Sequence, residues 1–153
     1  MRIPALLRVL TLIAASPVVA APNLTAEQAR PRVQHHLHEA DRLSQHFESV
    51  MQLPCARFTT TKEWEDYFNA EIEQVVLFWA HVEQAWVEAK RTGDDDVRRE
   101  AKAPRQKSQR AWALIAKLEV CAAGNGASFS PIAVWRRIEG ELPTRQTQIA
   151  LPQ

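Results

Sequence analysis

A single apolar stripe in the middle of the chain constrains the fold more than any other feature of this sequence. Between Thr60 and Thr92, large apolar residues recur every three or four positions, the spacing that puts them on one face of an α-helix. Tyr67, Val76 and Phe78 widen this face enough to contact two neighbouring elements. The pattern predicts a long helix inside a bundle. The members of the stripe are Trp64, Phe68, Ile72, Val75, Trp79, Val82 and Trp86.

Capping signals mark both ends of this helix. Thr60 and Glu63 have the spacing of a capping box, and Thr92-Gly93 supplies the glycine on which helices commonly end. Three acidic residues follow, Asp94, Asp95 and Asp96. They suit the start of the next helix, as caps and as charges facing the positive end of its dipole. They are also candidates for contact with a basic partner.

A helix is also expected before this one, between Pro31 and Pro54. Its apolar stripe has the same three-and-four spacing, and Thr25 with Gln28 is expected to cap a short turn that precedes it. The stripe consists of Val33, Leu37, Ala40, Leu43, Phe47 and Val50.

Two helices are expected in the last third of the chain. A long one runs from the acidic residues to Gly124-Asn125-Gly126, and Pro104 is expected to kink or divide it. A short one begins at Ser130-Pro131, a cap followed by proline at the first helical position, and ends at Pro143. The polar residues after Pro143 are interpreted as a tail.

Together these elements define the fold class. The chain has only four glycines and no alternating run of valine or isoleucine, so it lacks the pattern of a sheet. We expect an all-α protein, a small up-and-down bundle of three long helices plus a short C-terminal helix. Residues 21–153 are expected to form a single domain with its core in about 31–142.

The first twenty residues resemble a secretory leader. Arg2 and Arg8 form a basic region, Val9 to Ala15 is a short apolar run, and Val18-Val19-Ala20 provides the small residues of a cleavage site. We expect cleavage after Ala20 and export to an oxidising compartment, most simply a bacterial periplasm, or secretion. The apolar run is too short to span a membrane, and no cysteine lies near the junction to carry a lipid anchor.

The two cysteines, Cys55 and Cys121, are expected to form a disulfide, because an even pair in an oxidising compartment is usually bonded. The helices that follow Thr60 and Asp94 are joined by a short connection and should run antiparallel. Cys55 and Cys121 then both fall at the open end of this hairpin. A redox or metal-binding thiol pair is the alternative, but there is no Cys-x-x-Cys and no histidine at ligand spacing.

The charge balance argues against nucleic acid or an anionic membrane as a partner. Without Arg2 and Arg8 the 19 basic residues fall to 17, against 18 acidic residues, for a net charge of −1.

A histidine-rich stretch is the candidate metal site. His35, His38 and His46 lie with His36, Glu39 and Asp41 on the helix after Pro31, and neutral imidazole is a common ligand of zinc, copper or nickel. No two histidines are four residues apart, so a tight site needs a ligand from another helix, for which His81 is the only further histidine. The alternative is a solvated helix face, and no cofactor is expected.

Catalytic signals are lacking. There is no Gly-x-Ser-x-Gly and no His-Glu-x-x-His, and Glu71 and Glu73 are two residues apart, which puts them on different helix faces. We therefore expect a protein that is not an enzyme. Most of the tryptophans have core spacing, and Trp135, on the short terminal helix, is the candidate anchor for a protein partner.

The last third of the chain resembles the LprI-type lysozyme-inhibitor family. The resemblance rests on Gln109 and Trp112 on one helix, Cys121 nine residues later, the turn 126–128 and the polar run 144–147, and it covers residues 105–151. Family members usually carry a further cysteine in the last helix, which this chain lacks. Gln109, Trp112 and Cys121 are interpreted as structural, holding the third and fourth helices together.

The resemblance implies an exported protein that inhibits a lysozyme, or a similar peptidoglycan hydrolase, by steric occlusion. Acidic groups such as Asp94, Asp95 and Asp96 would then meet the basic surface of the enzyme. Two alternatives remain open: a metal-binding periplasmic protein that uses the 35–46 histidine cluster, and a chaperone-like envelope protein with an apolar groove. An immunity role against a delivered toxin would use the same scaffold.

Overall fold

The computed structural model describes residues 23–102 and 105–152, and the expected leader and its cleavage site lie outside them. All regular structure in these residues is helical, which confirms the all-α class. None of the described helices combines the length and apolarity that crossing a membrane requires. The helices are α1 (Ala26–Gln52), α2 (Thr61–Lys90), α3 (Asp95–Glu100), α4 (Arg105–Gly124) and α5 (Pro131–Ile149).

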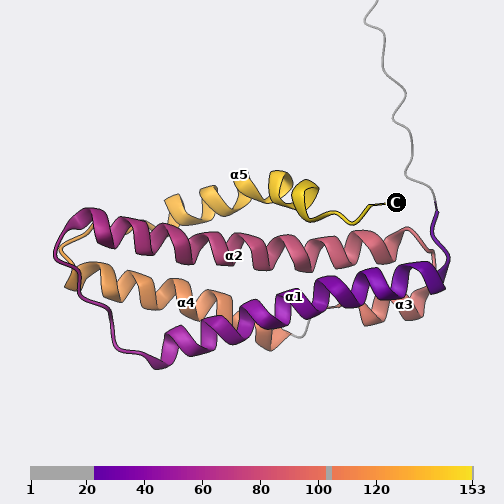
Figure 1. The fold of residues 1–153 in the computed structure, drawn as a ribbon, viewed down its shortest axis with the longest axis horizontal. Helices are drawn as coiled ribbons and strands as arrows, with labels where there is room; N and C mark the ends of the chain where they lie inside the picture. Colours follow the sequence, from indigo (N-terminus) through magenta and orange to yellow (C-terminus); the bar gives the residue numbers. More distant parts are fainter. Residues whose placement is uncertain (1–22, 103–104, 153) are drawn as a thin grey trace, which may run out of the picture.

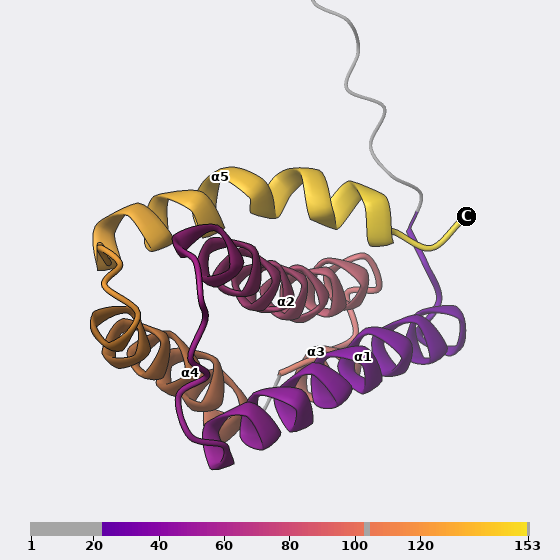
Figure 2. The same ribbon diagram turned by 60° about the vertical axis from the view of Figure 1, so that its left-hand side comes forward.

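Helix α2 is the centre of the bundle. It packs along α1 on one side and along α5 on another, while α4 lies against both α1 and the first half of α2 (Figures 1 and 2). Packing against these three helices explains the wide apolar face predicted for α2, because a helix with several neighbours needs apolar residues around much of its circumference. Phe47 of α1 and Phe78 of α2 are fully buried at its middle, with ring centroids 5.6 Å apart in an edge-to-face contact.

The core has two parts. The larger part joins α1, α2, α4 and α5 around Phe47 and Phe78, and it includes Leu114, Leu118 and Ile138. The smaller part lies near the end of α2, where small side chains allow α1 and α3 to approach closely. Its buried members are Ala29, Val33, Ala85, Ala89, Val97 and Ala101.

The predicted start of the first helix was wrong. Helix α1 begins at Ala26, because Thr25 and Gln28 form a complete capping box for this helix and not for a separate turn. Pro31 therefore lies inside α1. Its missing N–H removes one intrahelical hydrogen bond, and burial of Ala29 and Val33 against the smaller core holds the helix together across it.

The predicted limits of the second helix are confirmed. The Thr60 side chain accepts a hydrogen bond from the backbone N–H of Glu63 at 3.2 Å, and the Glu63 carboxylate accepts one from the N–H of Thr60 at 3.0 Å. Helix α2 ends before Gly93, which has the left-handed φ of 71°. The next helix is divided, as expected, into α3 and α4, although Pro104 itself lies outside the described residues.

The predicted end of the C-terminal helix was also wrong. Helix α5 has 19 residues and continues through Pro143 to Ile149, so the expected polar tail is mostly helix. Contacts with α2 outweigh the local effect of the proline. Arg137 donates to the Asn69 side chain at 2.7 Å, and Arg145, beyond the proline, pairs with Glu73.

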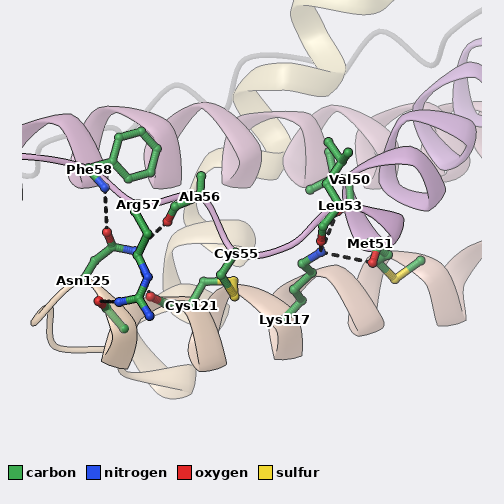
Figure 3. Close-up of a disulfide and its surroundings, with 11 residues drawn as sticks. Val50, Met51, Leu53, Cys55, Ala56, Arg57, Phe58, Lys117, Cys121 and Asn125 are labelled. Atoms are coloured by element: carbon green, nitrogen blue, oxygen red, sulfur yellow. Dashed lines mark hydrogen bonds between the residues drawn. A yellow bond between two sulfur atoms is a disulfide. The ribbon is translucent and has the colours of Figure 1, made fainter.

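The predicted disulfide is confirmed. Cys55 and Cys121 are bonded, with their Cα atoms 5.2 Å apart, and join the segment before α2 to the end of α4 (Figure 3). Asn125 reinforces this junction by accepting from the Phe58 N–H at 3.0 Å and donating to the Ala56 carbonyl at 3.0 Å. Nearby, Lys117 donates to the carbonyls of Val50 and Met51 and so satisfies the C-terminal end of α1.

Candidate functional site

Two exposed tryptophans meet across the seam between α4 and α5. The ring centroids of Trp112 on α4 and Trp135 on α5 are 5.1 Å apart at an interplanar angle of 31°. Trp79 of α2 lies behind them, 6.3 Å from Trp112, so the pair rests on the central helix. Trp112 is 45% exposed and Trp135 is 41% exposed. The two rings therefore present a rigid apolar surface to solvent, which we call the tryptophan surface.

A shallow hollow of about 190 Å³ adjoins the tryptophan surface. Ile115 and Ile138 form part of its floor, and Trp112, Trp135 and Phe129 form part of its walls. This volume suits one or two side chains of a partner. It is small for an unfolded segment or a drug-sized molecule, whose pockets usually exceed about 300 Å³.

Acidic residues flank the tryptophan surface. Glu119 lines the hollow two turns beyond Trp112, and Glu139 is exposed one turn beyond Trp135. Because α4 and α5 run in opposite directions (Figure 1), the chain leads from Trp112 to Glu119 and from Trp135 to Glu139 toward opposite ends of the seam. Neither forms an ion pair with another side chain in the described part of the chain. A partner that covers the rings can therefore place basic groups against both.

The acidic turn predicted as a partner contact lies elsewhere. Asp94 is the N-cap of α3 and accepts hydrogen bonds from the N–H groups of Asp96 and Val97 at 2.8 and 3.0 Å, which lower the pKa of its carboxyl. Asp95 and Asp96 pair with Arg98 and Arg99 of the same helix. The turn lies at the end of the bundle where α2 ends (Figure 1), whereas the tryptophan surface lies beside Trp79, within α2.

The three candidate metal ligands do not come together at one site. His46 bonds through Nε2 to the Glu71 carboxylate at 2.8 Å, His38 is exposed, and the ring of His35 lies beside that of His36. His81 of α2 does come close, as a tight site requires, but it meets His36. In the described residues no three His, Cys, Asp or Glu side chains are grouped to hold a metal ion.

A buried polar layer between α1 and α2 was missed by the sequence reasoning. His36, His81, Gln84 and Glu88 are all buried there. Their spacing was the available signal, because His36 continues the stripe of α1 from Val33, and the α2 residues recur at three and four positions. Polar residues at such positions indicate buried hydrogen-bonded groups.

Glu88 forms ion pairs with two arginines in this layer. Its carboxylate accepts two hydrogen bonds from Arg32 of α1 at 3.0 and 2.9 Å, and one from Arg91 at 3.1 Å. Burial raises the pKa of Glu88, but Arg32, the Gln84 amide and Arg91 together hold it below its usual value. Arg32 also donates to the carbonyls of Leu151 and Pro152 at 2.8 and 2.7 Å. One guanidinium therefore joins α1, α2 and the C-terminal segment.

The remaining candidate residues have clear positions. Trp112 does lie between α4 and α5, while Gln109 is exposed on α4 and Cys121 is buried in the disulfide. Glu71 and Glu73 occupy different faces of α2, as expected, since one contacts His46 of α1 and the other Arg145 of α5.

No known family model matches this chain, and neither a curated protein nor a solved structure is significantly similar to it.

Proposed function

We propose that this chain is an exported protein-binding domain without enzymatic activity, which inhibits a lysozyme or a similar peptidoglycan hydrolase by covering its substrate cleft. The observation that carries the proposal is the exposed pair Trp112 and Trp135. The resemblance of residues 105–151 to LprI-type inhibitors supports a hydrolase as the partner.

The tryptophan surface has the properties of a binding hot spot. Tryptophan is enriched among the few residues that dominate the energy of protein interfaces, particularly beside a pocket. Both rings lie on helices that the core and Trp79 hold in place, so little conformational entropy is lost when a partner covers them. The hollow beside them accepts one projecting side chain of the partner.

Charge favours a basic partner at this site. Glu119 and Glu139 lie from the ring pair toward opposite ends of the seam, and opposite charge on a partner increases the association rate and fixes its orientation. This arrangement assigns the acidic contribution to α4 and α5, and leaves Asp94 with the role of capping α3.

Export is supported by two features. Residues 1–20 have the pattern of a secretory leader, and the disulfide between Cys55 and Cys121 is of the kind that persists in an oxidising compartment.

The test is inhibition of peptidoglycan hydrolysis by c-type and g-type lysozymes. The chain from Ala21 onward, with its disulfide formed, should inhibit at least one of them at close to one molecule per enzyme. Trp135→Ala should weaken inhibition by about 30-fold or more, the effect of losing a hot-spot residue of about 2 kcal/mol.

Val87→Ala is the matched control, because Val87 is also an apolar residue that is 41% exposed, on α2. It should leave inhibition unchanged. Absence of inhibition at large excess over both enzymes would reject the hydrolase as partner. Equal inhibition by Trp135→Ala and the parent chain would reject the tryptophan surface.

A further inference from the structure

Two histidines from different helices meet inside the bundle. His36 of α1 is fully buried and His81 of α2 is 8% exposed, and their Nδ1 atoms are 3.1 Å apart. A hydrogen bond at this distance requires one nitrogen to carry a proton and the other to offer a lone pair. The contact therefore needs one ring whose Nδ1 is free of a proton, and it is lost if both Nδ1 atoms are protonated.

The environment of His36 indicates which ring donates. Its Nε2 atom is buried and has no hydrogen-bond partner among the described residues. If Nε2 carries a lone pair and no proton, no unsatisfied N–H is buried there. The proton of neutral His36 is then on Nδ1, so we assign the Nδ1–H of His36 as the donor to His81. Protonating His36 would then add both a charge and an unpaired N–H to a site without water-facing surface.

The charged groups around the pair are already engaged. On α1 these are Arg32, His35, Glu39 and Arg42, and on α2 they are His81 itself and Glu88. Glu88 is bonded to Arg32, and Glu39 is bonded to Arg42 at 3.0 Å. Each nearby carboxylate thus has an arginine partner, and the attraction of Glu88 for a proton on His36 and of Glu39 for one on His81 does not overcome the effect of burial.

We propose that the His36–His81 pair is a pH-sensitive latch, which holds α1 against α2 at neutral pH and weakens that contact in acid. The pair lies close to a junction between α1, α2 and the C-terminal segment. Arg32 lies one turn before His36 and holds both Glu88 and the C-terminal segment 151–152. A cation at His36 is repelled by Arg32 less than it is attracted by Glu88, so the weakening in acid comes from the burial of a charge and of an unpaired N–H beside this junction.

The direction of the effect follows from burial. Burial, then His81 and His35, lower the pKa of His36 from 6.5 to about 4, and burial also lowers the pKa of His81. In the unfolded chain histidine takes up its proton near pH 6.5, whereas in the folded chain His36 does so only near pH 4. The contribution of His36 to the free energy of unfolding is therefore complete above pH 6.5 and decreases between pH 6.5 and about pH 4. It is lost below about pH 4.

The first test measures the titration of both histidines in the folded chain by NMR, with ¹³C-labelled histidine. The imidazole of His36 should stay neutral down to about pH 5, well below the pH near which histidine in an unfolded chain takes up its proton. A His36 that takes up its proton near pH 6.5 would overturn the proposal. This measurement needs no variant and does not depend on the identity of any partner.

The second test measures urea unfolding at pH 7 and pH 5. The shift of His36 predicts that the folding equilibrium constant falls by up to about 20-fold between these pH values. His36→Leu should lose that part of the pH dependence, and His38→Gln, a change at an exposed histidine of the same helix, should retain it. Equal pH dependence in the parent chain and His36→Leu would reject the latch.

Discussion

Removing the disulfide gives the sharpest prediction about stability. The bond closes a loop between residues 66 positions apart, from the segment before α2 to the end of α4. Replacing both cysteines by alanine removes this constraint from the unfolded chain. The folded junction keeps other contacts, because Asn125 still bonds to Phe58 and Ala56 and Lys117 still bonds to the end of α1 (Figure 3). We therefore expect the variant to fold, with reduced stability.

The size of the loss follows from the loop. In the chain-entropy model, closing a loop of this length stabilises the folded state by about 4 kcal/mol at 25 °C. That is a large part of the roughly 5–15 kcal/mol typical of a whole domain. Since the unfolded chain becomes less compact without the bond, the dependence of unfolding on urea should also steepen.

Urea denaturation of Cys55→Ala/Cys121→Ala against the oxidised parent checks both the loss of stability and the steeper dependence on urea. Asn125→Ala in the oxidised chain is the matched comparison, because it breaks hydrogen bonds at the same junction without changing the connectivity of the unfolded state. It should lower stability with an unchanged urea slope. A loss below about 1 kcal/mol in the double variant, with an unchanged slope, would refute the assigned role of the bond.

Three further substitutions test the packing and the polar layer by urea denaturation. Phe47→Ala should cost about 3–5 kcal/mol, because it empties a fully buried site against Phe78, and a cost below about 1 kcal/mol would contradict that packing. Glu88→Ala should cost about 3–5 kcal/mol, because it leaves Arg32 without its carboxylate partner, whereas exposed Glu83→Ala should stay within about 0.5 kcal/mol; similar costs would contradict the buried ion pair. Thr60→Ala should cost about 1 kcal/mol through loss of the α2 cap, and no loss would show that this cap contributes nothing.

The helices were predictable where local signals and packing agree. The cap at Thr60 and the glycine at 93 mark α2 in the sequence, and the structure uses both. Pro31 and Pro143 misled because proline was taken as a boundary, while tertiary contacts carry both helices past it. The contact of Arg145 with Glu73 joins distant parts of the chain, so no local pattern reveals it.

The candidate site was predictable only in part. Trp135 was identified as an anchor from its place on a terminal helix, but its partner ring was assigned to packing. Spacing shows which face of a helix a residue occupies, and it does not show whether a neighbouring helix covers that face fully. Trp112 contacts α5 and is still 45% exposed, a balance that depends on the placement of two helices.

Footprinting by hydroxyl-radical oxidation, read by mass spectrometry for each residue, tests the central claim most directly. The chain would be compared alone and in complex with the lysozyme that it inhibits. Oxidation of Trp112 and Trp135 should fall in the complex, while that of half-buried Trp86, near the C-terminal end of α2, should not change. Protection confined to the α3 end, or unchanged oxidation of both exposed rings in a saturated complex, would contradict binding through the tryptophan surface.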